Sequence, residues 1–277
     1  MQNNSHTRTA ALITGASSGI GYELTKRFAR DGFDVVLVAR DEAQLKRVAD
    51  ALTGTFNVSV TVIPKDLSRP GAAAEVYREV KGNGIEIDIL VNNAGFNIYG
   101  PFSETSSREE LEMMHVNIVA LTQLTKLFLP AMLKRNSGKI LNVASTVAFT
   151  PGPYSAVYGA SKAYVLSFSE AIAEEVRGTG VSVSTLCPGP TQTQFAERAK
   201  MRNTKVFQGR LSSAVEVAEA GYRGLFQERT TVIVGLANKL LIFSLRFTPR
   251  NLITRIAKRL LSSTVSRPQA RAVLRRS

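Results

Sequence analysis

Residues 14–21 read Thr14-Gly15-Ala16-Ser17-Ser18-Gly19-Ile20-Gly21, and they separate an apolar run, Ala10–Thr14, from a segment with helical periodicity. Glycines permit a tight turn and let the main chain approach a pyrophosphate, whose charge is favoured at a helix amino terminus. A plain turn is the alternative for such a loop taken alone. The strand–turn–helix setting favours nucleotide binding. The expected contacts are Gly15, Ser17, Ser18, Gly19, Ile20 and Gly21.

Apolar, β-branched runs alternate with helical patterns along most of the chain. The expected strands are Ala10–Thr14, Asp34–Ala39, Val58–Ile63, Ile87–Asn92, Lys139–Ala144, Val181–Cys187 and Thr230–Val234. The expected helices are Ile20–Asp31, Glu42–Leu52, Gly71–Lys81, Ser107–Lys134, Tyr158–Arg177 and Ser213–Gln227. This alternation predicts a doubly wound α/β domain, residues 1–235, in which right-handed crossover helices cover both faces of a parallel sheet of about seven strands.

Ligands of such sheets bind beyond the carboxyl ends of the strands, so functional residues should follow strands. The segment 189–211 is the longest connection without strand character. Its mixture of polar and apolar residues suits a lid over a site.

The overall composition favours a folded cytoplasmic protein. Cys187 is the only cysteine, which excludes an intramolecular disulfide and suits a reducing compartment. Met1–Arg8 is polar, and no uninterrupted apolar run reaches the length of about 20 residues that spans a bilayer. No Cys/His cluster has zinc-ligand spacing, so we expect no metal.

The glycine spacing G-x-x-x-G-x-G at Gly15, Gly19 and Gly21 resembles the short-chain dehydrogenase/reductase family, and the resemblance extends over Ala10–Gly235. Further motifs follow in the family's order: Asp66, Asn92-Asn93-Ala94-Gly95, Asn117, Ser145, Tyr158-x-x-x-Lys162, and Pro188-Gly189 with Thr191 and Thr193. The resemblance implies a Rossmann-type fold and an oxidoreductase that transfers a hydride between a nicotinamide cofactor and a carbonyl or secondary alcohol.

The residue after the second strand bears on the choice of cofactor. NAD-preferring folds usually carry an acid there, which accepts hydrogen bonds from the ribose hydroxyls. Here the strand ends in Val38-Ala39-Arg40, and the guanidinium of Arg40 can hold a 2′-phosphate through charge-assisted hydrogen bonds, which predicts NADP(H). The alternative is that Arg40 is solvated or stacks on adenine, with Asp41 facing the ribose.

The resemblance implies further cofactor contacts. Asp66, with Leu67 beside it, would contact the adenine; a helix cap is the alternative, weakened because Ser68 is closer to the helix start. Asn93, Ala94 and Gly95 would line the adenosine, and Pro188, Gly189, Thr191 and Thr193 would hold the nicotinamide carboxamide and the phosphates. Taken singly, each of these two stretches could be a simple turn.

Hydride transfer at a carbonyl carbon needs an acid or base beside the oxygen. A free tyrosine has a pKa of about 10, and Lys162 lies one helical turn after Tyr158, where its charge would lower that pKa. An ordinary surface pair is the alternative. Ser145 would orient the substrate oxygen, although by itself it could be a turn residue or a cap. The resemblance implies that Asn117 bends its helix and holds a water that links Lys162 to solvent.

The substrate is expected to be a lipophilic carbonyl or alcohol, because apolar residues occupy the likely rim loops. They are Phe96, Ile98, Phe102, Phe149, Tyr154, Phe195 and Phe207. A non-catalytic NADP(H)-binding sensor or scaffold is the rival interpretation, since a fold does not establish an activity. The presence of Asn117, Ser145, Tyr158 and Lys162 argues against it.

The carboxyl-terminal extension, residues 236–277, carries most of the net positive charge. The net charge is +13, and the extension holds ten Lys and Arg residues without any Asp or Glu. An apolar stripe predicts a basic amphipathic helix: Leu252, Ile253, Ile256, Ala257, Leu260 and Leu261. Such a helix could pack on another subunit of a dimer or tetramer, cover the substrate pocket, or lie in an anionic membrane surface. Nucleic acid is not expected, because few aromatic residues interleave the charges.

Overall fold

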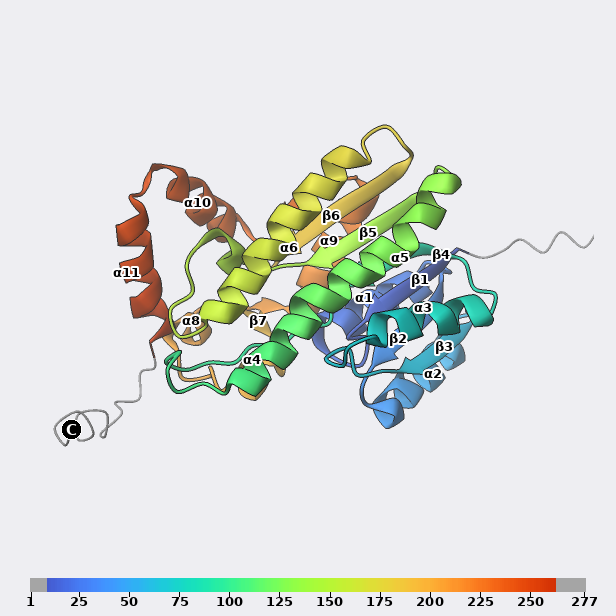
Figure 1. Ribbon diagram of the computed structural model, residues 1–277, viewed down its shortest axis with the longest axis horizontal. Coiled ribbons are helices and arrows are strands. Elements are labelled where there is room, and N and C mark those ends of the chain that lie inside the picture. The colour runs from blue at the N-terminus through green and yellow to red at the C-terminus, as the bar shows by residue number, and fades with distance from the viewer. Residues whose placement is uncertain (1–8, 263–277) are drawn as a thin grey trace, which may run out of the picture.

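The computed structural model describes residues 9–262, whose centre is a seven-stranded parallel sheet with helices on both faces (Figure 1). The strands lie in the order β3-β2-β1-β4-β5-β6-β9. They are β1 Ala10–Thr14, β2 Asp34–Ala39, β3 Val60–Pro64, β4 Ile87–Asn92, β5 Gly138–Val143, β6 Val181–Cys187 and β9 Thr231–Ile233. The predicted doubly wound α/β class is therefore confirmed, and the winding direction reverses between β1 and β4, where such sheets bind ligands.

Both faces of the sheet are buried, which explains why its strands are almost continuously apolar. In β1, Ile13 belongs to a core cluster with Phe28 and Tyr222, whereas Leu12 belongs to a second cluster with Val76 and Phe128. The first face is covered by α1 Gly19–Arg30, α2 Glu42–Thr55 and α9 Ala214–Phe226. The second is covered by α3 Ala72–Gly82, α5 Leu121–Lys134 and α6 Ala156–Glu175.

The predicted helix Ser107–Lys134 is continuous but not uniform. It consists of α4 Ser107–Met114, the π-helix η1 His115–Ala120 and α5. By length and composition alone it could cross a membrane. In the fold, Leu124, Phe128 and Met132 belong to the core cluster beneath it, as expected of a core helix in an α/β protein.

Two local expectations were wrong. The third strand begins at Val60 rather than Val58 and ends at Pro64. The lid segment also contains a strand, since β7 Thr191–Gln192 pairs in parallel with β8 Ser212–Ser213. Two paired residues are too few to produce a periodic pattern. The short helices α7 Phe195–Arg198 and α8 Lys205–Gln208 lie between β7 and β8. Elsewhere, η2 Thr146–Phe149 is a single 3₁₀ turn that follows β5.

The chain after β9 forms an arm that stands apart from the sheet, at the left of Figure 1. The arm consists of α10 Leu236–Ser244, the 3₁₀ turn η3 Leu245–Phe247 and α11 Arg250–Leu261. The predicted amphipathic helix therefore exists, and no residue of the three elements is fully buried. Met1–Arg8 and the last part of the extension, residues 263–277, lie outside the described residues. The division at residue 235 remains a prediction.

Candidate active site

The glycine loop joins β1 to α1 at the edge where the winding reverses. Gly15 and Gly19 have φ angles of +67° and +57°, in the left-handed region that favours glycine. A Cβ atom on Gly21 would lie 2.2 Å from the carbonyl oxygen of Gly15, so a side chain there would collide with the loop. The first turn of α1 has neither a side-chain cap nor an acidic residue. Its N–H groups are thus available to a phosphate, and this cradle fits the pyrophosphate of a dinucleotide.

Asn93 and Ala94 brace the glycine loop from β4. The side-chain amide of Asn93 donates to the carbonyl oxygens of Thr14, at 2.9 Å, and Gly15, at 3.3 Å. The main-chain N–H groups of Asn93 and Ala94 both donate to the hydroxyl of Thr14, each at 3.0 Å. Thr14 was not identified from the sequence, because its only signal there is a hydroxyl group at the end of a strand. The adenosine-lining role of Asn93, Ala94 and Gly95 stays a prediction.

The two acids near the expected adenosine end have local partners. Asp41 caps α2 by accepting a hydrogen bond of 2.9 Å from the N–H of Gln44. Arg40, which directly follows β2, is exposed. Asp66 accepts from the N–H and hydroxyl of Ser68, and α3 begins later, at Ala72. Partial burial disfavours the charged form of Asp66, but the Ser68 hydrogen bonds and the positive charge of Arg40 outweigh it and lower its pKa. Arg40 and Asp66 are therefore neighbours.

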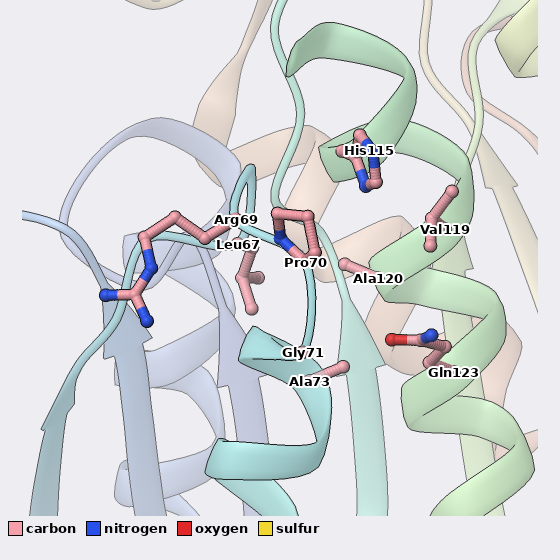
Figure 2. A pocket seen from close by; sticks show the side chains of 9 residues that line it. All are labelled: Leu67, Arg69, Pro70, Gly71, Ala73, His115, Val119, Ala120 and Gln123. Atoms are coloured by element: carbon pink, nitrogen blue, oxygen red, sulfur yellow. The ribbon is translucent and has the colours of Figure 1, made fainter. Parts of the chain in front are cut away.

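Leu67 lines a small cavity of about 80 Å³ between the loop that follows β3 and the π-helix. Figure 2 shows Leu67 and Pro70 on one side of this cavity and His115 and Val119 on the other, while the guanidinium of Arg69 points away. The Leu67 side chain is buried. Its proposed contact with adenine remains a prediction, and His115 has no assigned role.

Ser145, Tyr158 and Lys162 come together from β5 and α6. Ser145 lies two residues after the end of β5, and its hydroxyl is hydrogen-bonded to that of Tyr158. Small residues follow Tyr158 on α6, and the ammonium of Lys162 lies 5.8 Å from the centroid of the Tyr158 ring. Lys162 is almost completely buried and donates a 2.8 Å hydrogen bond to the carbonyl oxygen of Val143. The predicted one-turn spacing therefore places both groups on one face of the helix.

Asn117 lies in the middle of the π-helix and is buried. Its side-chain oxygen accepts from the N–H of Phe96 at 3.1 Å, and its amide donates to the Phe96 carbonyl and to the hydroxyl of Ser161. A Cβ atom on Gly95 would lie 3.0 Å from the Asn117 oxygen and 3.3 Å from the Lys162 nitrogen. The absence of a side chain at Gly95 therefore allows the Asn117 and Lys162 side chains to approach the main chain there. The π-helix widens the helix at the residue that was expected to bend it.

The pKa values of Lys162 and Tyr158 are both shifted in the direction that burial favours. Burial lowers the pKa of Lys162 to about 8, opposed by the nearby Cys187. Burial raises the pKa of Tyr158 above its ordinary value, and the hydrogen bond with Ser145 opposes that shift. Lys162 was expected to lower the pKa of Tyr158, but the protein groups alone raise it. Burial costs the phenolate more solvation than the hydrogen bond with Ser145 restores.

The segment after β6 touches both halves of the site. The Pro188 carbonyl accepts from the N–H of Thr146 at 2.9 Å, and the hydroxyl of Thr191 donates to the Gly189 carbonyl at 2.9 Å. Gly189 also accommodates Asn238 of the arm, since a Cβ atom there would lie 2.6 Å from its amide nitrogen.

Two residues of this segment link the glycine loop with the phenol. The methyl group of Thr193 would lie 3.2 Å from a Cβ atom on Gly19. The ring of Phe195 lies 5.6 Å from that of Tyr158, measured between centroids. The glycine loop and Tyr158 are therefore on either side of the same short segment. Within residues 9–262, no group of three His, Cys, Asp or Glu side chains could hold a metal ion.

Several known proteins resemble this chain in sequence and in fold. The family model described as short chain dehydrogenase matches residues 9–204. The ketoacyl reductase HetN of Nostoc sp. is 31% identical over 229 residues, which cover 82% of this chain and 79% of HetN. A short-chain dehydrogenase from Sphingobium yanoikuyae, solved in complex with NADPH, has a TM-score of 0.78 and 31% identity, covering 95% of this chain and 98% of that one.

A second solved structure carries the other nicotinamide cofactor. The short-chain dehydrogenase/reductase from Burkholderia phymatum in complex with NAD has a TM-score of 0.76 and 26% identity, covering 85% of this chain and 92% of that one. The chain thus belongs to the short-chain dehydrogenase family. It is an oxidoreductase of the kind that uses a nicotinamide cofactor.

Proposed function

We propose that this protein transfers a hydride between NADP(H) and the carbonyl or secondary alcohol of a lipophilic substrate, with Tyr158 as the acid or base. The observation that carries the proposal is the cluster of Ser145, Tyr158 and Lys162, which Phe195 and Thr193 link to the glycine loop. A proton donor and a phosphate cradle on either side of one segment are what a dinucleotide-dependent reaction at a carbonyl requires.

In the reducing direction, Ser145 holds the carbonyl oxygen by a hydrogen bond and Tyr158 donates its hydroxyl proton to that oxygen. The hydride for the carbonyl carbon would come from a bound reduced nicotinamide, which would be oxidised as the carbonyl becomes an alcohol. The raised pKa of Tyr158 keeps the phenol protonated at neutral pH, which suits an acid. In the oxidising direction Tyr158 takes the proton, and positive charge from Lys162 and an oxidised nicotinamide favours its phenolate.

Lys162 and Asn117 are proposed to return the proton to solvent. With a pKa of about 8, Lys162 remains charged at neutral pH and can still release a proton. Its ammonium is held by the carbonyl of Val143, and Asn117 lies beside it across Gly95. A water held by Asn117 would complete this path. The remaining cofactor contacts are proposed for Pro188, Gly189, Thr191 and Thr193, which lie between the glycine loop and Tyr158.

The preference for NADP(H) is proposed on the placement of Arg40. The N–H of Gln44 holds the Asp41 carboxylate at the start of α2, and the exposed guanidinium of Arg40 is free to pair with a 2′-phosphate. The Sphingobium relative was solved with NADPH and the Burkholderia relative with NAD, so the family accommodates both. Arg40 is the residue of this chain that would discriminate.

A lipophilic substrate is proposed because an aromatic ring packs on Tyr158 and aromatic residues occur in the loops that precede it along the chain. Phe195 packs on its ring, Tyr154 packs on Tyr99, and Phe102 is 67% exposed in the adjacent loop. The relative HetN is named a ketoacyl reductase. A cytoplasmic location and a homo-oligomer are proposed on the sequence alone.

The decisive experiment is NADPH oxidation with a panel of ketones and aldehydes, comparing the wild type with Tyr158→Phe. We expect the turnover number to fall by about 10²- to 10⁴-fold, the usual contribution of a positioned acid, with NADPH affinity nearly unchanged. Tyr164→Phe is the matched control, because Tyr164 lies on the same helix and its hydroxyl bonds Thr122 at the surface. NADPH binding without turnover in the wild type, for any carbonyl, would instead identify a sensor.

A further inference from the structure

The helix α10 presents its apolar face to solvent. Leu236, Leu240 and Phe243, together with Phe247 of the following turn, recur at helical spacing and are 72, 62, 56 and 77% exposed. The partly buried positions lie on the opposite side of the helix, at Asn238, Ile242 and Leu245. A surface helix in water normally has the reverse arrangement, with its polar face outward. The exposed apolar row is therefore built for a surface other than water.

The helix α11 continues the same feature. Its inner row, Ile253, Ala257 and Leu261, is partly buried. A second apolar row one step around the helix, Leu252, Ile256 and Leu260, is 47, 48 and 44% exposed. We call the seven exposed residues of the two rows the apolar rows of the arm: Leu236, Leu240, Phe243, Phe247, Leu252, Ile256 and Leu260.

Cations flank these rows, and no carboxylate accompanies them. The exposed cations of the arm are Lys239, Arg246, Arg250, Arg255, Lys258 and Arg259. No Asp or Glu occurs anywhere in residues 236–277, and the remaining four Arg residues of that segment lie after residue 262. Among the described residues none of the six forms a salt bridge, so the arm has a net positive surface that other parts of the chain leave uncompensated.

We propose that the arm docks on the surface of a bilayer that contains anionic phospholipids. The apolar rows would enter the boundary between headgroups and acyl chains, while the long side chains of the flanking cations reach the phosphates. Symmetric pairing of this face with the same face of a second copy would bring cations against cations, because the arm contains no acid to pair with them. An anionic bilayer satisfies both the apolar and the basic part of the surface.

The docking surface adjoins the candidate active site. The hydroxyl of Tyr99 donates a 2.5 Å hydrogen bond to the carbonyl oxygen of Leu261, at the end of α11. The ring of Tyr99 in turn packs on Tyr154, 6.1 Å away between centroids, in the loop that leads to Tyr158. The inference does not depend on the proposed activity, since docking needs neither cofactor nor substrate.

The test is flotation of the full chain with vesicles of phosphatidylcholine alone or mixed with phosphatidylglycerol. We expect binding only to the mixed vesicles, and weaker binding as salt is raised, because salt screens the exposed charges. The double variant Phe243→Gln, Phe247→Gln should bind at least about tenfold more weakly. Leu111→Gln is the matched control, since Leu111 is a 53% exposed apolar residue on α4, outside the arm, and should bind as the wild type does.

Three results would overturn the inference. They are absence of binding to either vesicle, equal binding to both vesicles, or unchanged binding by the double variant. If the wild type does not bind vesicles and light scattering shows that the double variant has a different oligomeric state, the apolar rows form contacts between copies of the chain instead. Because all of these substitutions lie at exposed positions, circular dichroism should show the same fold for every variant.

Discussion

The sheet-containing body and the α10–α11 arm place the same residue types in opposite environments. Phe28 of α1 is completely buried between the sheet and Tyr222, whereas Phe247 of the arm is 77% exposed. Lys162 of the body is buried, whereas Lys258 of the arm faces solvent. Both regions contain amphipathic helices, such as α1 in the body and α11 in the arm, so helical periodicity alone did not distinguish them. What covers an apolar face decides whether it stabilises the fold or is available for binding.

The largest expected difference concerns the two phenylalanines. Phe28→Ala should lower the free energy of unfolding by about 3–5 kcal/mol, because it leaves a cavity in a close-packed core. Phe247→Ala should change it by less than about 0.5 kcal/mol, as expected of an exposed position. Urea denaturation of the two variants and the wild type measures both values. A loss of several kcal/mol for Phe247→Ala would mean that the arm is packed against another protein surface in solution.

Most of the body could be predicted from the sequence, because its signals are local and repeated. Six of the seven strands of the sheet lie within about one residue of their predicted bounds, since buried parallel strands are continuous apolar runs. The Tyr158–Lys162 pair followed from helical spacing, which fixes the face on which two side chains lie. The glycine turn likewise requires conformations that few other residues adopt.

The contacts that depend on segments far apart in the chain could not be predicted. The β7–β8 pair joins residues from the two ends of the lid, and the brace from Asn93 to Thr14 spans 79 residues. The raised pKa of Tyr158 depends on how tightly neighbouring segments surround the phenol, and spacing contains no information about burial. For the arm, the sequence predicted the amphipathic helix but not which of its faces would be exposed.

The buried charge of Lys162 should make the stability of the fold depend on pH. The pKa of Lys162 is about 8 in the folded protein, against an ordinary lysine value of 10.5. Below pH 8 both states hold the proton and the folded state bears the full penalty of the buried charge. Between pH 8 and 10.5 only the unfolded state holds the Lys162 proton, so the free energy of unfolding of the wild type should rise with pH. Relative to Lys162→Met, the total rise should be about 3 kcal/mol.

Urea denaturation of wild type and Lys162→Met across this pH range measures the difference. Lys258→Met controls for the loss of a cation that is exposed on the arm. If the difference between wild type and Lys162→Met stays constant from pH 8 to 10.5, the ammonium of Lys162 is hydrated in solution and does not experience the burial described above.

The smallest expected effect compares two exposed arginines, Arg40 at the end of β2 and Arg255 on the arm. Arg40→Ala should raise the KM for NADPH by about 10- to 100-fold, because a hydrogen bond to a charged group contributes about 1.5–3 kcal/mol, and it should leave the KM for NADH nearly unchanged. Arg255→Ala should alter neither KM, and should weaken vesicle binding instead. Steady-state kinetics with both cofactors separates the alternatives for Arg40. Equal increases for NADPH and NADH would indicate that Arg40 stacks on the adenine, which both cofactors share, rather than holding the 2′-phosphate that only one of them carries.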